Sequence, residues 1–129
     1  MKYLKRFESV IDDNIISSLK DIFKDLSDDI FDVYIEYKTF FGEKKPFLTI
    51  SIYKNSSGKE NAPAEDIYLY EIKDYIKRSI EYLRSEGLEL STVIPYGSRN
   101  SFIGRREEDV ENWNPDDIVM AMNVYFKEI

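Results

Sequence analysis

The residues best suited to binding chemistry gather in one segment, 95–117, which reads PYGSRNSFIGRREEDVENWNPDD. Its first half carries three arginines, and its second half is acidic and holds the only tryptophan of the chain. A guanidinium group recognises phosphate or carboxylate through two parallel hydrogen bonds, and long loops between strands are usually either functional or disordered. We therefore expect a long charged inter-strand loop that contacts a partner. Its candidate partner-binding residues are Arg99, Phe102, Arg105, Arg106 and Trp113.

The same segment has a second interpretation, in which its charges satisfy one another. Arg105 and Arg106 stand directly before an acidic run, 107–111, and a short helical turn would bring these charges together as ion pairs. Apolar residues would then hold the loop against the domain: Phe102, Ile103, Val110 and Trp113. The glycines of the segment lack the spacing of a nucleotide-binding loop, so no cofactor motif decides between the two interpretations.

Two residue types are missing from the chain, and their absence excludes several kinds of catalytic site. Without cysteine there is no disulfide, no thiolate nucleophile, no iron–sulfur cluster and no thiolate zinc site. Without histidine the commonest general base and the commonest transition-metal ligand are absent too. We expect a protein that is not an enzyme and holds no cofactor, although chemistry based on carboxylates, lysine, tyrosine or Mg²⁺ stays open.

Acidic residues occur in clusters that raise the alternative of a divalent-metal site. The clusters are Asp12-Asp13, Asp28-Asp29, residues 107–111 and Asp116-Asp117. Carboxylate oxygens are the ligands that Mg²⁺ and Ca²⁺ prefer, but none of these clusters has the alternating ligands and central glycine of an EF-hand loop. The pairs that precede strands are typical of turns, in which Asp bonds its own backbone. Solvated turns are therefore the favoured interpretation of these clusters.

Length, charge and hydropathy limit the class of protein. At 129 residues the chain fits a single domain, 1–129, with its own core. No apolar run is long enough to cross a bilayer, and the start, MKYLKRFESVIDD, has no secretory h-region, so we expect a cytoplasmic protein without membrane contact. The chain is rich in Ile, Lys, Asn, Asp and Tyr, whose codons are largely AT-rich, as in AT-rich cellular or viral genomes. If the protein is viral, the expected compartment is the host cytoplasm. A net charge of −7 disfavours general binding to a phosphate backbone and suits a basic partner.

The first half of the chain predicts one helix and two strands. Apolar residues recur at helical spacing through 7–26. Residues 31–38 then alternate between Phe, Val, Ile and Tyr on one face and Asp, Tyr, Glu and Lys on the other, which is typical of a half-buried strand. A short turn leads to 46–54, where apolar residues alternate again, so the two strands should form an antiparallel hairpin.

The second half follows a surface loop, 55–66, that is rich in turn formers. A stripe of leucine and isoleucine then predicts a helix that ends at Gly87. A strand over 88–94 comes next and is stopped by Pro95; its expected core face is Leu88, Leu90, Thr92 and Ile94. The last strand covers 118–127, and its expected core face is Ile118, Met120, Met122, Val124 and Phe126.

The element order is therefore α-β-β-α-β-β within one α+β domain. Moving the first strand of a ferredoxin-like β-α-β-β-α-β unit to its C-terminus produces this order. We expect a four-stranded, largely antiparallel sheet with two helices on one face, in a permuted ferredoxin-like layout whose second and fourth strands are central. The other two strands carry more charge, as edge strands tend to. Such an architecture implies no function by itself.

The uncovered face of this sheet is the second candidate binding surface. Its candidate partner-binding residues are Tyr34, Phe47, Tyr53 and Tyr125, and their expected neighbours are Thr49, Ser51, Val119 and Asn123. Aromatic rings on an open sheet can stack nucleic-acid bases, but the basic, glycine-flanked signature of such sheets is absent. Aromatic residues are also favoured in strands because they pack well there. The face therefore suits contact with a protein partner or a second copy of the chain as well as base stacking.

These observations favour a small acidic non-enzymatic protein that binds another macromolecule, of the general kind found among phage- and immunity-type inhibitors or adaptors. The expected partner is a protein. One alternative is a single-stranded nucleic-acid-binding module that uses the open face together with Arg99, Arg105 and Arg106. The least favoured alternative is a carboxylate enzyme with a divalent metal. A homodimer through edge strands or the open face is compatible with the sequence, which does not select it.

Overall fold

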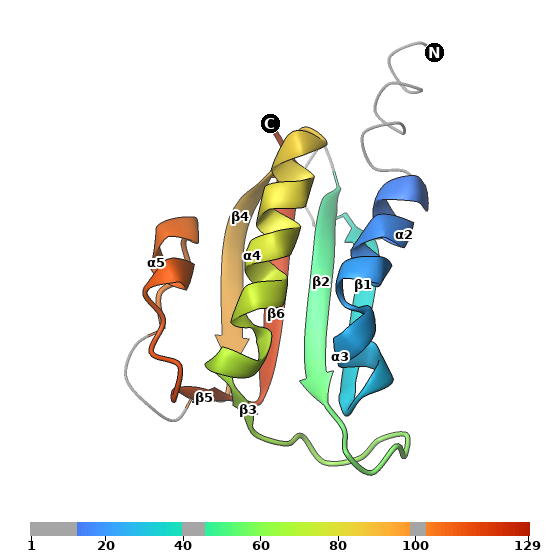
Figure 1. Ribbon diagram of the computed structural model, residues 1–129, viewed down its shortest axis with the longest axis vertical. Coiled ribbons are helices and arrows are strands. Elements are labelled where there is room, and N and C mark those ends of the chain that lie inside the picture. The colour runs from blue at the N-terminus through green and yellow to red at the C-terminus, as the bar shows by residue number, and fades with distance from the viewer. Residues whose placement is uncertain (1–12, 40–45, 99–102) are drawn as a thin grey trace.

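The computed structural model describes residues 13–39, 46–98 and 103–129 (Figure 1). Its helices are α2 (Asp13–Ile22), α3 (Lys24–Asp28), α4 (Leu69–Ser85) and α5 (Glu107–Glu111). Its strands are β1 (Phe31–Lys38), β2 (Phe47–Lys54), β3 (Ile67–Tyr68), β4 (Leu88–Tyr96), β5 (Ile118–Val119) and β6 (Ala121–Glu128). Both halves of the expected order are present, with the short elements β3, β5 and α5 added to them.

The main sheet has four antiparallel strands in the order β1-β2-β6-β4. The second and fourth of the expected strands, now β2 and β6, are therefore central, and the permuted ferredoxin-like strand order is confirmed. Their side chains are more buried than those of β1, whose second half is mostly exposed. The sequence contrast between apolar and charged strands thus predicted the position of each strand in the sheet.

The helices α2, α3 and α4 cover one face of this sheet, and α5 lies beside β4 (Figure 1). The core between the two layers is formed by the apolar stripe of each helix and the inward residues of each strand. Its largest fully buried side chains include Leu19, Phe23, Ile50, Ile52, Ile72, Ile76, Leu83 and Phe126. The ring of Phe23 stacks on Tyr75 with centroids 6.0 Å apart, which joins the end of α2 to α4.

The first helix differs from its expected form because it is divided in two. Residues 7–12 of the predicted helix lie outside the described residues. The break between α2 and α3 falls at Phe23, whose amide N–H still donates to Leu19 O over 3.0 Å. The carbonyl of Phe23 accepts from Ser27 over 2.9 Å, so the chain keeps its helical direction through the break.

The helix α4 begins directly after the two residues that form the strand β3. Ile67 pairs with Val119 and Tyr68 with Ile118 in a second, two-stranded sheet. Glu71 then accepts a hydrogen bond from the backbone N–H of Tyr68 over 2.9 Å, which satisfies one of the free donors at the helix start. Gly87, at φ +88°, ends the helix as expected.

The expected face assignment of β4 is wrong beyond Leu90. A β-bulge lies between Leu90, which is opposite Phe126, and Thr92, which is opposite Tyr125. The extra residue changes the alternation, so Val93 enters the core and Thr92 moves to the open face. Ile94 follows Thr92 onto the open face. The strand also continues through Pro95 to Tyr96, because proline is tolerated on an edge strand whose N–H side points away from the sheet.

The expected face assignment of the last strand is wrong at its start. The chain forms β5 over Ile118–Val119, is irregular at Met120, and resumes as β6. Val119 is fully buried, so it is not part of the open face where the sequence placed it, and Ile118 and Met120 are only half-buried. From Met122 onward the predicted core face is confirmed. Within the described residues, no helix has the length and apolar character needed to cross a membrane.

Candidate functional site

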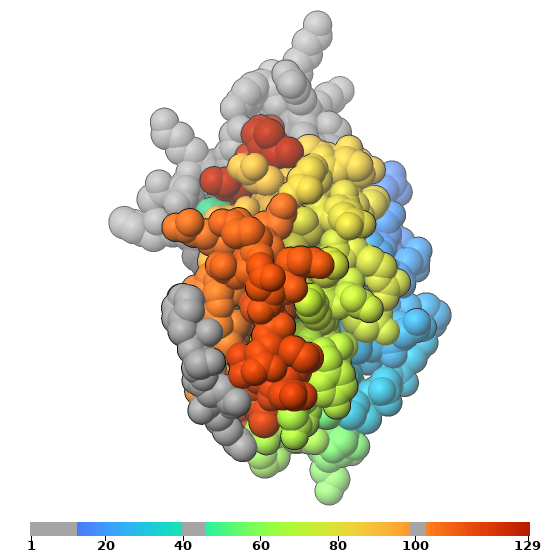
Figure 2. Space-filling view, turned by 60° about the vertical axis from the view of Figure 1, so that its left-hand side comes forward, coloured from blue at the N-terminus to red at the C-terminus, as the bar shows by residue number. Residues whose placement is uncertain are grey.

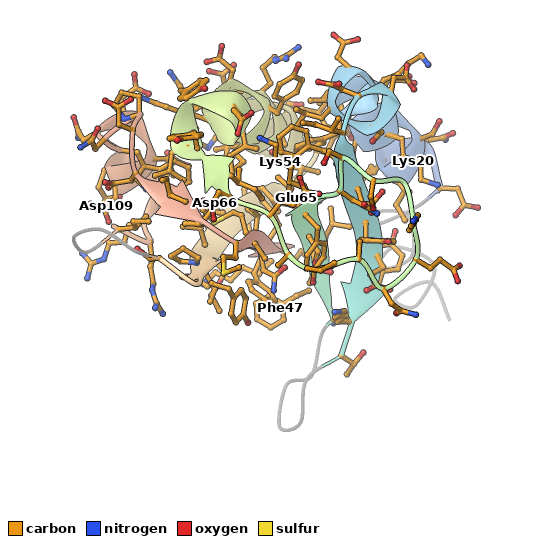
Figure 3. All side chains as sticks on the ribbon, turned by 90° about the horizontal axis from the view of Figure 1, so that it is seen from below. Lys20, Phe47, Lys54, Glu65, Asp66 and Asp109 are labelled. Carbon is orange, nitrogen blue, oxygen red and sulfur yellow. The ribbon has the colours of Figure 1, made fainter. Side chains whose placement is uncertain are left out.

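The open face of the sheet is built from the residues that alternate with the core residues. Its middle row runs across all four strands, and the residues that stand opposite one another are Tyr34, Ser51, Asn123 and Ile94. Figure 3 shows the helices on one side of the sheet and Phe47 on the other. The predicted residues Tyr34, Phe47, Tyr53 and Tyr125 all lie on this face. The structure therefore brings together every residue that the sequence assigned to it as a candidate contact.

Aromatic rings contact one another on this face. Tyr34 and Tyr53 meet edge to face with centroids 6.0 Å apart, and Phe47 and Tyr125 do so at 6.4 Å. Tyr34 is 55% exposed and Tyr53 is 40% exposed, so their contact lies at the surface. Edge-to-face contacts hold rings in a fixed relative orientation, which lowers the entropy cost of using them to bind a partner.

Sequence reasoning missed Tyr96, which is 47% exposed on the same face. Tyr96 stands opposite Ala121 at the end of β4, the edge strand farthest from the strand β1 that carries Tyr34. The prediction that Pro95 ends the strand removed Tyr96 from consideration. A signal was present in the sequence, because LSTVIPY contains two possible alternations and only one of them places Val93 in the core.

The floor of the face is small and polar. Thr49 and Ser51 are buried although they belong to the open side, because larger side chains stand opposite them on both neighbouring strands. These are Glu36 and Tyr125 beside Thr49, and Tyr34 and Asn123 beside Ser51. Thr49 Oγ1 donates to Glu36 O over 3.1 Å. The side-chain oxygen of Asn123 is buried and has no hydrogen-bond partner among the described residues. A ligand that donates a hydrogen bond at this point would satisfy that oxygen.

The surroundings of Tyr125 on this face raise the pKa of its phenol. Burial raises the pKa of its phenol above the ordinary value of 10.0, and the neighbouring phenol of Tyr96 raises it further. Lys38 and a hydrogen bond with Asn123 act in the opposite direction. The hydroxyl of Tyr125 is therefore neutral near pH 7 and does not take part in acid–base chemistry there.

A cleft of about 900 Å³ opens at the β1–β2 side of the face. Its walls are the open side of β1 and β2 and the loop 55–66, and its lining includes Tyr34, Tyr53, Lys38, Lys59, Asp32, Glu36 and Glu60. Acidic and basic side chains thus alternate around two exposed rings. The cleft has no single sign of charge that would select a strongly anionic or strongly cationic ligand.

The loop 55–66 is held over this cleft by its own hydrogen bonds. Asn55 Nδ2 donates to Asp32 on β1 over 3.3 Å and to Lys59 O over 3.1 Å. Glu65 accepts from the backbone N–H of Ser56 over 2.8 Å and from its hydroxyl over 2.6 Å, so the two ends of the loop are tied together. The Ser56 bonds lower the pKa of Glu65, which keeps its carboxylate charged. The predicted surface loop is therefore an ordered wall of the cleft.

The described part of the segment 95–117 packs against the domain through apolar residues that its second interpretation named. Figure 2 shows its described part, in orange, lying against α4 in yellow and green. Ile103, Val110 and Trp113 are buried in the core cluster. Trp113 is only 5% exposed, so it supports the segment rather than presenting a surface to a partner. Arg99 and Phe102 lie outside the described residues.

The acidic half of this segment pairs with α4 more closely than with its own arginines. Lys77 contacts Glu111 at 2.7 Å, and Arg84 forms an ion pair with Glu107. Arg106 reaches Glu108 only at 3.9 Å, between two highly exposed side chains. The expected local ion pairs of Arg106 are thus weak. Lys77 lowers the pKa of Glu111, and Glu111 raises that of Lys77, through their hydrogen bond.

Arg105 and Arg106 are exposed beside the buried part of the segment. The backbone carbonyl of Arg105 accepts from Val93 N over 3.0 Å, which fixes the chain at this point while its side chain stays at the surface. No group of three or more Asp and Glu residues that could hold a metal ion occurs within the ranges that the structure describes. Of the acidic pair Asp116-Asp117, Asp116 is exposed but Asp117 is buried, so the interpretation as a solvated turn is wrong for Asp117.

Comparison with known proteins adds no further constraint on the site. The chain matches no protein-family model, and neither the curated proteins nor the solved structures contain a match to it.

Proposed function

We propose that this protein acts by binding another protein, without catalysis, and that the open face of the sheet is its contact surface. The observation that carries the proposal is the group of exposed tyrosines Tyr34, Tyr53 and Tyr96 around a buried polar floor. Tyrosine supplies a large contact area at low entropy cost and is enriched at protein interfaces. A binding role of this kind fits an inhibitor or adaptor, such as those of phage- or immunity-type systems.

The proposed partner is a protein surface of mixed charge. The cleft beside Tyr34 and Tyr53 alternates lysine with acidic residues, so a partner gains opposite charges on both sides of the two rings. Arg105 and Arg106 are exposed residues of the segment that lies beside β4, at the opposite edge of the sheet from this cleft. Their guanidinium groups would extend the contact to carboxylates of the partner. The net charge of −7 favours a partner that is basic overall.

A matched pair of double variants tests this surface. Tyr34→Ser/Tyr53→Ser removes the ring pair on the open face, and Tyr68→Ser/Tyr70→Ser removes an equally exposed ring pair, 5.4 Å apart, at the start of α4. A partner captured from the native source would be purified and titrated with all three proteins by calorimetry. We expect the first variant to raise Kd roughly tenfold or more and the second to leave it within about twofold.

The opposite pattern, in which only the α4 variant weakens binding, would move the contact surface away from the open face. If neither double variant changes the Kd of the captured partner, the contact surface also lies away from the open face. Circular dichroism of each variant establishes that its fold is intact before the titration.

Single-stranded nucleic acid is the second candidate ligand for the same face. Lys38 and Lys59 lie in the cleft with the exposed rings of Tyr34 and Tyr53, an arrangement that can hold a backbone and stack bases. The acidic residues of the same cleft oppose it. Fluorescence anisotropy with a labelled oligonucleotide at low salt separates the two candidates: binding that falls steeply as salt is added supports nucleic acid, and no binding supports a protein partner.

A further inference from the structure

The outer edge of β1 presents a row of backbone groups that no other strand of the described chain pairs with, because β1 is the last strand of the sheet. The direction of these groups follows from one contact. Asn55 N donates to Ile30 O over 2.6 Å, and the two residues continue the register of β1 and β2. Since successive residues of a strand point their N–H and C=O to alternate sides, the outward groups belong to Phe31, Val33 and Ile35.

The opposite edge of the sheet is covered by the chain itself. Val93 N on β4 donates to Arg105 O over 3.0 Å, and the hydroxyl of Thr92 approaches the same carbonyl at 3.4 Å. A β-bulge and Pro95 further interrupt β4. Bulges, proline, covering loops and charged side chains are devices by which proteins keep an edge strand from pairing. β1, at the right of Figure 1, has neither a bulge in its pairing with β2 nor a proline.

We propose that a second copy of this chain pairs with β1 through its own β1, antiparallel and about a two-fold axis, to form one continuous sheet. Outward residues must face outward residues for the backbone hydrogen bonds to form, which allows only registers shifted by two residues at a time. One register places Ile35 opposite itself in the partner. The same register places Asp32 opposite Lys38 and Tyr34 opposite Glu36.

Charge complementarity selects this register over its neighbours. With Ile35 on the axis, symmetry generates two Asp32–Lys38 pairs, and opposite charges directly across a sheet are favourable. A shift in one direction places Asp32 opposite Glu36, and a shift in the other places Glu36 opposite itself. Both alternatives bring like charges together at close distance on the same face. The side chains concerned are accessible, since Lys38 and Glu36 are each about half exposed in their own pair at 3.3 Å.

The dimer has a consequence for the open face. A two-fold axis perpendicular to the sheet keeps the helices of both copies on one side and both open faces on the other. The ring pairs of Tyr34 and Tyr53 from the two copies would then stand side by side on a single surface. The proposal does not depend on what binds that surface, and either inference can fail without the other.

Disulfide trapping tests the register directly, because the chain has no cysteine of its own. Asp32→Cys and Lys38→Cys are prepared as separate proteins and oxidised alone and as a mixture. In the proposed register the two positions face each other at a non-hydrogen-bonded pair, where Cα atoms are about 4.5 Å apart and a disulfide can close. The same residue in the two copies is roughly 20 Å from its equivalent. We expect a cross-linked dimer from the mixture and none from either variant alone.

A charge exchange provides the second test. Asp32→Lys and Lys38→Asp each place like charges across the interface, and each should weaken the dimer roughly tenfold in sedimentation equilibrium. Mixing the two variants restores opposite charges at both pairs, so the mixture should recover the dimer. Asp32→Asn keeps a polar contact with Asn55 while removing the charge, and should weaken the dimer less. Glu89→Lys and Lys127→Asp make the same charge changes at β4 and β6 and should leave the dimer unchanged.

Three results would overturn the proposal. The first is a chain that stays monomeric by sedimentation at millimolar concentration. The second is cross-linking by either cysteine variant alone, which requires another register. The third is a dimer that the controls at Glu89 and Lys127 weaken as much as the β1 variants do, which places the interface elsewhere.

Discussion

The indole N–H of Trp113 donates a hydrogen bond to the carbonyl of Gly104 over 2.9 Å, across nine residues of the chain. This contact closes the described part of the charged segment into a compact unit that contains α5. Gly104 has no room for a side chain, because an added Cβ would collide with Asp109. Trp113 and Gly104 therefore fix the backbone next to the exposed residues Arg105 and Arg106.

We expect the Trp113–Gly104 contact to stabilise the folded state. Trp113→Phe keeps most of the buried ring and loses the hydrogen bond, so we expect a cost of about 1–2 kcal/mol. Trp113→Ala also leaves a cavity and should cost roughly 3–5 kcal/mol. Urea unfolding followed by circular dichroism measures both. Equal costs for the two variants would show that the hydrogen bond, and not the packing, fixes the segment.

The partly buried pair of Lys54 and Glu71 predicts a second stability effect. Lys54 Nζ lies 3.1 Å from Glu71 Oε1, and both side chains are less than a fifth exposed. Glu71 also accepts the bond from Tyr68 N at the start of α4. Glu71→Ala removes both interactions and should cost about 2–3 kcal/mol, whereas Glu71→Gln keeps an acceptor and should cost about 1 kcal/mol.

Lys54→Met separates the two roles of Glu71, because it removes the ammonium group that pairs with Glu71 and leaves the bond from Tyr68 N in place. It also removes that ammonium group from the Phe31 ring, whose centroid lies 5.7 Å away. A double-mutant cycle of Lys54→Met and Glu71→Gln in urea unfolding gives the energy of the pair itself, expected near 1 kcal/mol. A coupling energy close to zero would leave the helix cap as the only stabilising role of Glu71.

The loop over the cleft should respond to acid through Glu65. The Ser56 bonds lower the pKa of Glu65 below its ordinary value of 4.5, so the folded protein binds this proton less tightly than the unfolded chain. The contribution of these bonds is therefore complete above about pH 4.5 and is lost as the pH falls through the lower, folded-state pKa. Carbon-detected NMR titration of the Glu65 carboxylate should show the lowered pKa.

Ser56→Ala supplies the control for this titration. The substitution removes the hydroxyl bond and should move the Glu65 pKa part of the way back toward its ordinary value, since the backbone N–H bond stays. An unchanged pKa in Ser56→Ala would mean that the hydroxyl contributes nothing to holding the loop.

The order and position of the main strands could be predicted from the residue types within each strand. The charges at Asp32, Glu36 and Lys38 marked β1 as an edge, and the apolar run of β2 marked it as central, because burial on both sides selects against charge. These are local signals. The pairing of Glu107 and Glu111 with α4 is not local: it joins residues more than twenty positions apart, and spacing alone favoured the nearer arginines.

Only part of the open face could be predicted, because local alternation identifies some of its residues and not others. Tyr34, Phe47, Tyr53 and Tyr125 belong to regular strands, and simple alternation placed them correctly. Tyr96 was missed because Pro95 was expected to end β4. A bulge also reverses the alternation of this strand, and it leaves no distinctive residue type at Ser91. The position of the bulge is set by the pairing of Leu90 and Thr92 with successive residues of β6, so it depends on the partner strand and not on β4 alone.

The bulge itself leads to a prediction that distinguishes two deletions within β4. Deleting Ser91 removes the extra residue, and Leu88, Leu90 and Val93 then alternate regularly toward the core, so we expect a cost of about 1 kcal/mol or less. Deleting Glu89 instead turns the fully buried Leu88 onto the open face and should cost roughly 2–3 kcal/mol. Urea unfolding compares the two. If the Ser91 deletion costs as much as the Glu89 deletion, the bulge is required for the bond between Val93 and Arg105, and amide hydrogen exchange at Val93 would then be faster in that variant.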